Sequence, residues 1–287
     1  MQKLRLFITV FILGALSLYS CNNDDEYALP SGKGRINILL TDSPFPVEMV
    51  NSAVIYIDKV EIRHKLDGQM EGDTDSFIVV AENQMEINLL DLTNGITEQI
   101  ATADLEAGTY DMIRLHVTDA AIILNDGTQH DLKIPSGSSS GLKIKIDPAI
   151  YLEEGQTSDV LLDFDVSRSF VLKGNMNNIV GFNFKPVVRC VYMGAAGRVE
   201  GTVTDTLSNP LENAMVKILL PMNEKSLPDE DSVLTSSFTD ADGNYKLIGI
   251  PGGIYSVICE MDGFESDTVK DVTVTEGNST NVDFQLE

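Results

Sequence analysis

Apolar and polar side chains alternate along most of this chain with a period of two residues. In the clearest case, Ile113, Leu115 and Val117 alternate with polar neighbours. Because successive side chains of an extended strand point to opposite faces, this pattern predicts strands that are buried on one face. Alternating or short apolar runs of this kind cover residues 36–40, 54–62, 77–81, 113–117, 121–124, 142–146, 160–166 and 180–191. Turn-forming clusters such as residues 125–127 separate them, so the sequence predicts an all-β fold.

Two segments depart from the alternating pattern. Residues 88–105 have a mixed pattern that predicts at most one short helix. Residues 193–197, Met-Gly-Ala-Ala-Gly, are small and uncharged, which is typical of a domain boundary. The sequence therefore predicts two β-sandwich domains in tandem, residues 34–193 and residues 197–287, and predicts that the first is antiparallel.

The first residues have the layout of a secretory signal. Lys3 and Arg5 precede the apolar run 6–16, which is shorter than the roughly 20 residues needed to span a bilayer. The run leads into Leu-Tyr-Ser-Cys at residues 18–21, which resembles the cleavage site of bacterial lipoproteins. The resemblance implies a signal peptide of residues 1–20 and acyl chains, including palmitate, on Cys21. The alternative is an ordinary secreted protein cut elsewhere.

An acidic tether, residues 21–33, follows this site. Asp24, Asp25 and Glu26 resemble the export signal with which some Gram-negative bacteria move lipoproteins to the outer face of the outer membrane. The resemblance implies a lipid-anchored protein of the outer membrane that faces the cell exterior. The alternative is a solvated charged tether, because acidic stretches that are poor in apolar residues are usually solvated.

The charge balance narrows the range of partners. The chain has 20 basic and 44 acidic residues and a formal net charge of −24. Loss of residues 1–20 would remove two basic residues and no acidic one, which leaves 18 against 44 and a net charge of −26. Such a surface repels phosphate backbones and anionic headgroups. Nucleic acid is therefore excluded as a partner, and membrane contact is expected only through the lipid on Cys21.

Two cysteines remain after Cys21. Cys190 and Cys259 both lie in apolar runs with the pattern of strands, where a buried free thiol is expected. An exported protein would permit a disulfide between them, which is the alternative.

The last ninety residues carry a recognisable order of motifs. They include Asp-Gly-Asn-Tyr at 242–245 and Pro-Gly-Gly-Ile-Tyr at 251–255. Residues 197–287 thereby resemble the carboxypeptidase regulatory-like domain, a transthyretin-like β-sandwich. The resemblance implies a folding and spacing module, because the chain lacks the zinc peptidase that this domain accompanies in enzymes. Some classifications group such sandwiches with starch-binding-like domains, which would imply sugar binding. The chain has no Trp, however, and Tyr245 and Tyr255 have the pattern of core residues.

The first domain also resembles a known family. Leu-Leu-Thr-Asp-Ser-Pro at 39–44 and Gly-Thr-Tyr at 108–110 are similar to those of a bacterial lipoprotein family of unknown function. Asp42 would lie at the end of a strand, where it either caps the turn or binds a ligand or cation. Residues 106–110 and 251–255 share a Gly-x-Tyr pattern at the start of a strand, which suggests related sandwiches.

Candidate catalytic and metal-binding residues are few. His64, His116 and His130 are scattered, and His116 falls on the polar face of its strand, where we expect it to be exposed. Asp163 and Asp165 share one strand face, as the two acids of a retaining glycosidase do, but like charges on a solvated face are the commoner outcome. The chain contains no phosphate loop. We therefore expect no enzyme activity, no cofactor and no bound metal.

Two further motifs are short. Asp-Ala-Asp-Gly-Asn at 240–244 is similar to the start of a calcium loop, but its glycine is out of register and residue 251 is Pro, so we interpret it as a turn. Three Asp-Ser/Thr-aliphatic triplets resemble an O-glycosylation acceptor, with Thr206, Ser232 and Thr268 as the acceptor residues.

Two classes of function remain open. The first is a non-catalytic surface lipoprotein whose sandwiches bind an unknown protein or glycan, for instance in adhesion. The alternative is a carbohydrate-binding accessory protein of a glycan uptake system. The sequence does not identify the partner.

Overall fold

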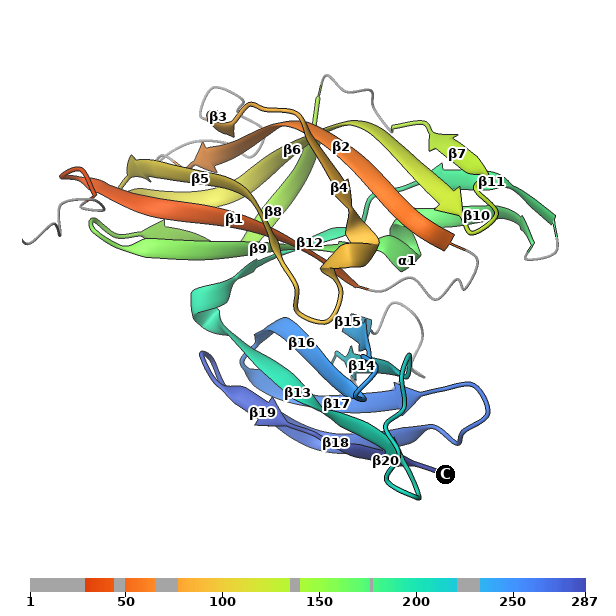
Figure 1. Ribbon diagram of the computed structural model, residues 1–287. Coiled ribbons are helices and arrows are strands. Elements are labelled where there is room, and N and C mark those ends of the chain that lie inside the picture. The colour runs from red at the N-terminus through yellow and green to blue at the C-terminus, as the bar shows by residue number, and fades with distance from the viewer. Residues whose placement is uncertain (1–28, 44–49, 66–76, 135–139, 176–177, 221–232) are drawn as a thin grey trace, which may run out of the picture.

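The computed structural model describes residues 29–43, 50–65, 77–134, 140–175, 178–220 and 233–287, and these form two β-sandwich domains joined by a short connection (Figure 1). Cys21, Asp24, Asp25, Glu26 and Ser232 lie outside the described residues. The all-β prediction is confirmed. Among the described residues, no helix is long and apolar enough to cross a membrane.

The first domain contains a six-stranded sheet, called the large sheet below. Its strand order is β3-β2-β6-β7, with β4 also beside β2 and β8 also beside β6. The strands are β2 (Val50–His64), β3 (Phe77–Ala81), β4 (Met85–Asn88), β6 (Gly108–Leu124), β7 (Gln129–Leu132) and β8 (Leu142–Leu152). The longest pairing joins β2 to β6.

A four-stranded small sheet packs against the large sheet. Its order is β12-β9-β1-β5, and its strands are β1 (Lys33–Ser43), β5 (Glu98–Glu106), β9 (Thr157–Asp165) and β12 (Val188–Tyr192). The main core lies between the two sheets, where Ile38 on β1 and Ile62 on β2 are both fully buried. Each of these residues alternates with an outward-facing neighbour, as the period-two pattern predicts.

Two details of the first domain differ from the prediction. β1 pairs with β9 in parallel, with Ile38 opposite Val160, so the domain is not purely antiparallel. A parallel pair needs a long crossover and leaves no local turn signal in the sequence. The expected helix at residues 88–105 reduces to the 3₁₀ helix η1 (Leu89–Leu92), and the rest of the segment contributes to β5.

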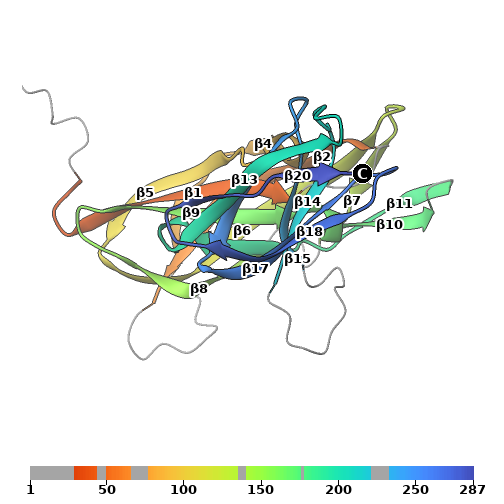
Figure 2. The same cartoon turned by 90° about the horizontal axis from the view of Figure 1, so that it is seen from below.

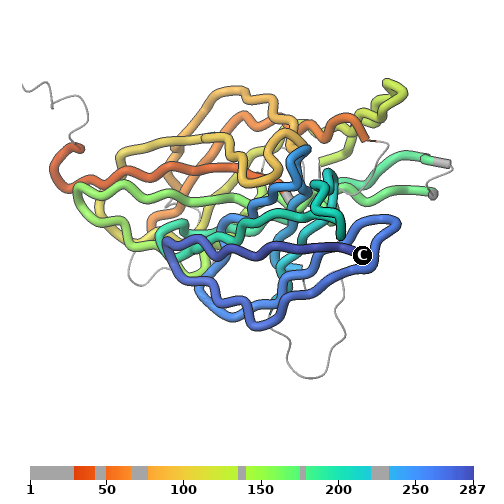
Figure 3. The backbone as a smooth tube through the Cα atoms, turned by 60° about the horizontal axis from the view of Figure 1, so that its bottom comes forward, coloured from red at the N-terminus to blue at the C-terminus, as the bar shows by residue number. Residues whose placement is uncertain are grey.

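A small hairpin completes the first domain. It consists of β10 (Phe170–Asn175) and β11 (Asn178–Phe184), and it follows the one-turn helix α1 (Val166–Ser169). The hairpin projects from one end of the sandwich (Figure 3), opposite the end at which β1 begins. Three phenylalanine rings pack at its base.

The second domain is a sandwich of two four-stranded sheets, and it follows the 3₁₀ helix η2 (Met193–Ala195). One sheet has the order β16-β13-β19, with β20 also beside β13, and the other has the order β15-β14-β17-β18. The strands are β13 (Ala196–Asp205), β14 (Met215–Leu219), β15 (Val233–Phe238), β16 (Asn244–Pro251), β17 (Gly253–Glu260), β18 (Asp267–Val274), β19 (Ser279–Asn281) and β20 (Phe284–Leu286). Tyr245 and Tyr255 lie in its core, as predicted.

The second domain lies against the outer face of the small sheet (Figures 1 and 2). A separate apolar cluster marks this contact: Leu161 and Val191 come from the small sheet, and Ile248 comes from β16. The small sheet is therefore covered on both faces, by the large sheet on one side and by the second domain on the other.

The shared Gly-x-Tyr pattern forms the same local structure in both domains. The Tyr110 hydroxyl donates to the Glu106 carbonyl at 2.8 Å, and the Tyr255 hydroxyl donates to the Pro251 carbonyl at 2.9 Å. Each tyrosine thus ties the start of its strand to the residue four positions earlier, in the manner of the tyrosine corner of immunoglobulin sandwiches. Burial raises the pKa of both hydroxyls, that of Tyr110 to about 12.

These two corners allow a first prediction. Tyr110→Phe and Tyr255→Phe should each lower the free energy of unfolding by about 1 kcal/mol, because each removes one side-chain hydrogen bond to a backbone carbonyl while preserving ring packing. Urea unfolding followed by circular dichroism measures the change. Tyr151→Phe is the matched control, since this ring is 62% exposed and the change should have no effect. Equal stability of all three variants would show that the corners do not stabilise the fold.

Candidate functional site

A cluster of ionisable side chains lies on the outer face of the large sheet, and we call it the outer-face network. Its members are Glu61, Arg63, Asp111, Arg114 and His116. Glu61, Arg63, Arg114 and His116 alternate on β2 and β6 with core residues, and Asp111 lies at a register shift in β6. Glu61 lies opposite Arg114, and the neighbouring pair Ile62 and Ile113 points to the core. The period-two pattern therefore directs these charges to one face, and strand register brings opposite charges together.

Glu61 is the centre of the network. Its Oε2 is 2.7 Å from His116 Nε2 and 3.2 Å from Arg114 Nη1. Burial alone would raise the pKa of this carboxyl, but the hydrogen bonds from His116 and Arg114 outweigh it, and the net shift of the pKa is downward. Glu61 is therefore held as a carboxylate that accepts hydrogen bonds, and it is not a free acid or base.

Each of the two arginines is held by a specific partner. Arg63 forms a forked ion pair with Asp111, with distances of 2.8 Å and 2.9 Å from its Nε and Nη2. The guanidinium of Arg114 lies over the ring of Phe77, 3.7 Å from the ring centroid. A cation over an aromatic face is stabilised by the ring quadrupole. Both guanidinium groups are thus held in one orientation.

Two exposed lysines lie beside the outer-face network. Lys143 on β8 lies opposite Arg114 in the ladder, and Lys145 lies opposite Met112. Because side chains alternate along the strand, both lysines point away from the core, and both are exposed. Lys145 forms an exposed ion pair with Asp147 at 3.1 Å, so charges of both signs lie along this part of the sheet. The arrangement positions no nucleophile beside a free base.

His116 and Asp163 were expected on solvated faces, and both expectations are wrong. His116 is 5% exposed and pairs with Glu61. Asp163 is 3% exposed, and its Oδ2 lies 2.6 Å from Arg189 Nη2. Asp165 is only half-buried, and it caps α1 by accepting from the backbone N–H of Arg168. The predicted carboxylate pair is therefore two structural contacts with different partners.

Asp42 is held in the interior at the end of β1. It is 4% exposed, and its Oδ1 accepts from the backbone N–H of Val166 at 3.2 Å. The neighbouring Thr41 hydroxyl lies within 3.0 Å of the carbonyls of Leu92 and Ile96. Asp42 thus bonds to the start of α1, a segment distant in sequence, and this contact matches the structural interpretation better than a ligand site.

The 240–244 motif has the geometry of a turn. Asp240 Oδ1 accepts from the backbone N–H groups of Asp242 and Asn244 at 3.0 Å and 2.8 Å. Asp205 repeats the pattern by accepting from the N–H groups of Leu207 and Asn209, both at 2.8 Å. Both carboxylates accept hydrogen bonds from backbone groups of their own loop. Across the described part of the chain, no three His, Cys, Asp or Glu side chains are grouped to hold a metal.

The predicted glycosylation acceptors lie in two settings. Thr206 is exposed in the loop that Asp205 caps, and Thr268 is exposed on β18. Leu207, beside Thr206, is 80% exposed. Both threonines are therefore accessible to a modifying enzyme, while Ser232 is not described.

The two described cysteines are free and buried, one in each domain. The expected free thiols are confirmed, and no disulfide joins Cys190 to Cys259. Burial raises the pKa of each thiol to about 12. Because the thiolate is the reactive form, both should be inert at neutral pH.

This burial allows a second prediction. In a soluble chain that begins after Cys21, Ellman's reagent should titrate no thiol under native conditions and two thiols after denaturation. Rapid reaction of one thiol in the folded chain would show that the domain containing it opens to solvent. Exposed thiols introduced at Asp126 and Asp262, in loops of the first and second domains, provide the positive controls.

The outer-face network was missed by sequence reasoning, although a signal for it exists. β2 carries Lys59, Glu61 and Arg63 at alternate positions, and β6 carries Arg114 and His116 in the same way. Alternate charges of opposite sign on two strands are consistent with a charged ladder. The register that pairs them cannot be obtained from either strand alone.

Comparison with known families gives two matches in this chain. The model described as Domain of unknown function (DUF4382) matches residues 33–186. The model described as Carboxypeptidase regulatory-like domain matches residues 198–287. Together they agree with the two-domain layout. No curated protein matches the sequence.

Solved structures match at low similarity. The 3-chlorocatechol 1,2-dioxygenase of Rhodococcus opacus is 15% identical with a TM-score of 0.24, and the match covers 32% of this chain and 60% of that one. The dioxygenase domain of a dioxygenase and carbohydrate-binding fusion from Streptomyces is 18% identical with a TM-score of 0.26, covering 33% and 80%. The minor pilin of Streptococcus agalactiae is 12% identical with a TM-score of 0.24, covering 87% and 94%. Similarities at these TM-scores carry no argument about activity.

Proposed function

We propose that this chain, which belongs to the family described as Domain of unknown function (DUF4382), is a non-catalytic lipoprotein that presents two β-sandwich domains for binding or adhesion. The domains are residues 34–193 and 197–287. Lipid on Cys21 anchors the chain in the outer membrane, and the sandwiches face the cell exterior.

One observation carries the non-catalytic assignment. The three buried carboxylates of the described residues bind structural partners: Glu61 binds His116 and Arg114, Asp163 binds Arg189, and Asp42 accepts from a backbone N–H. Catalytic acids and bases need a free proton site and a pKa near the working pH. Glu61, whose pKa is shifted downward by the hydrogen bonds that it accepts, offers neither.

The lipid anchor is supported by the sequence around Cys21. A basic start, a short apolar run and a small residue before the cysteine are the features of a lipoprotein signal. Metabolic labelling with an alkyne analogue of palmitate tests it. The parent chain should be labelled and partition with membranes, and Cys21→Ser should lose both properties. Unchanged labelling of Cys21→Ser would overturn the anchor.

Surface display is supported by the acidic cluster after Cys21. Protease shaving of intact cells should degrade the parent chain and spare a variant with Asp24, Asp25 and Glu26 changed to Ala. A variant with Asn22 and Asn23 changed to Ala is the matched control and should remain accessible. Equal accessibility of all three would remove the export role of the acidic residues while leaving the anchor untouched.

Glycans are the alternative class of partner, and the described surface has few side chains that suit them. Sugar platforms stack aromatic rings on pyranose faces, and Tyr151 is the one large aromatic side chain that is well exposed among the described residues. A glycan array probed with the soluble chain, with and without calcium, tests this alternative. Signal that disappears in Tyr151→Ala would establish sugar binding, and no signal under either condition favours a protein partner.

A further inference from the structure

The outer face of the small sheet is a packed surface. Leu39, Leu161 and Val191 lie side by side on β1, β9 and β12, and all three point away from the main core. Leu161 is fully buried even so, because Ala196 and Ile248 from the second domain complete the cluster. A single exposed leucine is common on protein surfaces, but three adjacent apolar positions on a sheet face require a cover.

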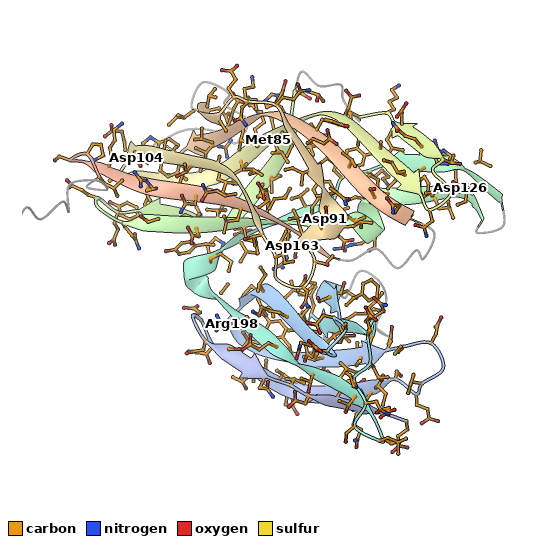
Figure 4. All side chains as sticks on the ribbon, viewed as in Figure 1. Met85, Asp91, Asp104, Asp126, Asp163 and Arg198 are labelled. Carbon is orange, nitrogen blue, oxygen red and sulfur yellow. The ribbon has the colours of Figure 1, made fainter. Side chains whose placement is uncertain are left out.

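A polar contact crosses the same joint beside the apolar cluster. Arg189 on β12 uses both arms of its guanidinium: Nη2 binds Asp163 of the first domain at 2.6 Å, and Nη1 donates to the Gly249 carbonyl of the second domain at 2.7 Å. Figure 4 shows Asp163 on the side of the first domain that faces the second. The planar fork of arginine fixes the direction of both bonds, so the contact defines an orientation as well as a distance.

Gly249 lies directly against the apolar cluster. It has a φ of +66°, and a Cβ at that position would lie 2.8 Å from Leu161 Cδ2. A larger residue would therefore displace the Leu161 side chain of the first domain besides adopting an unfavourable backbone conformation.

A second contact between the domains involves a segment of the first domain that is remote in sequence from Arg189. The loop between η1 and β5 carries Gly95, whose added Cβ would lie 2.8 Å from Lys246 Cδ on β16. Beside it, Asn94 Nδ2 donates to the Asn244 carbonyl at 3.4 Å. Contacts from β12, β9 and this loop therefore meet β16 at several points, and separated contacts restrict rotation as well as translation.

The linker between the two domains is short. β12 ends at Tyr192 and β13 begins at Ala196, so only the single turn η2 lies between them. Domains of one chain move relative to each other unless contacts between them restrict the motion, and an apolar interface is the most effective restriction. Here a short linker, an apolar cluster and a forked arginine act together.

We propose that the two domains form one rigid body, in which the second domain is the fixed partner of the outer face of the small sheet. Any partner of the chain then meets a single composite surface whose loops keep constant positions, and the second domain does not swing as an independent module. The proposal goes beyond the function given above, because it holds whether or not the chain is anchored by lipid.

Distance measurements by pulsed electron paramagnetic resonance test the proposal. Spin labels are placed at Asp126→Cys and Asp262→Cys, one exposed loop site in each domain, in the soluble chain that begins after Cys21. The buried Cys190 and Cys259 should remain unlabelled. The parent chain should give one narrow distance distribution. Gly249→Val and Arg189→Met should broaden it roughly twofold, as expected when an interdomain contact is lost.

The controls separate a loosened joint from a damaged domain. Arg198→Met is matched to Arg189→Met, because Arg198 is a half-exposed arginine whose partner Glu200 is on its own strand, and it should leave the distribution narrow. Continued protection of Cys190 and Cys259 from Ellman's reagent reports that each domain is still folded. A broad distribution in the parent chain, or a distribution that stays narrow in both joint variants, would overturn the proposal.

Discussion

Glu61→Leu should lower the free energy of unfolding by about 3 kcal/mol, which is the effect expected when one partner of a buried ion pair is removed. The Glu61 side chain is 11% exposed, and it holds His116 at 2.7 Å and Arg114 at 3.2 Å. Leucine leaves the buried Arg114 guanidinium without its carboxylate, and the large sheet offers it no replacement at the same position. Urea unfolding of the soluble chain measures the change.

A triple variant distinguishes a lost charge pair from lost packing. Glu61→Leu combined with Arg114→Met and His116→Leu removes every group that Glu61 satisfied, so most of the lost stability should return. Glu98→Leu, at an exposed position on β5, is the single-site control and should change stability by less than about 0.5 kcal/mol. If the triple variant is as unstable as the single one, the cost arises from packing, and the network does not stabilise the sheet electrostatically.

The sequence predicts those features that depend on one strand or one turn at a time. Ile36, Ile38 and Leu40 were placed on a buried face by alternation, and all three are fully buried. The turn at 240–244 followed from the chemistry of Asp and Gly, and the structure shows the expected hydrogen bonds. These features are local, so the sequence contains all the information that determines them.

Features that depend on distant parts of the chain were not predictable in the same way. The parallel pairing of β1 with β9 joins Arg35 to Thr157 across more than a hundred residues. The burial of Asp163 depends on a different domain that covers an otherwise polar strand face, and the burial of His116 depends on Glu61 from another strand. Alternation assigns a residue to a face, but only the tertiary structure determines what covers that face.

The same limit applies to the candidate site. The charges of the outer-face network are visible in the sequence, yet their interpretation as solvated residues was the statistically ordinary one. Strand register converts alternate charges on β2 and β6 into ion pairs, and Phe77 on β3 then covers Arg114. The chemistry of the face therefore follows from pairing, and a prediction of function from residue types alone misses it.

Phe184→Ala should lower the free energy of unfolding by about 3 to 5 kcal/mol, the range for truncating a buried phenylalanine. Phe184 is 4% exposed on β11 and lies opposite Phe170 on β10. Its ring is 5.1 Å from that of Phe170 and stacks on Phe164 of β9 at 6.1 Å. A two-stranded hairpin is marginally stable by itself, so contacts with the sandwich must stabilise β10 and β11, and this aromatic cluster supplies a large share of them.

Hydrogen exchange can separate loss of the hairpin from general destabilisation. In Phe184→Ala the amides of β10 and β11 should exchange much faster than those of β1 and β9, because the hairpin opens as a local unit once its anchor is lost. Val171→Ala lies on the same hairpin, but its side chain is 42% exposed, so it should leave both stability and exchange nearly unchanged. Uniformly faster exchange across both sheets would instead mean that the cluster stabilises the whole first domain, with the hairpin as an integral part of its core.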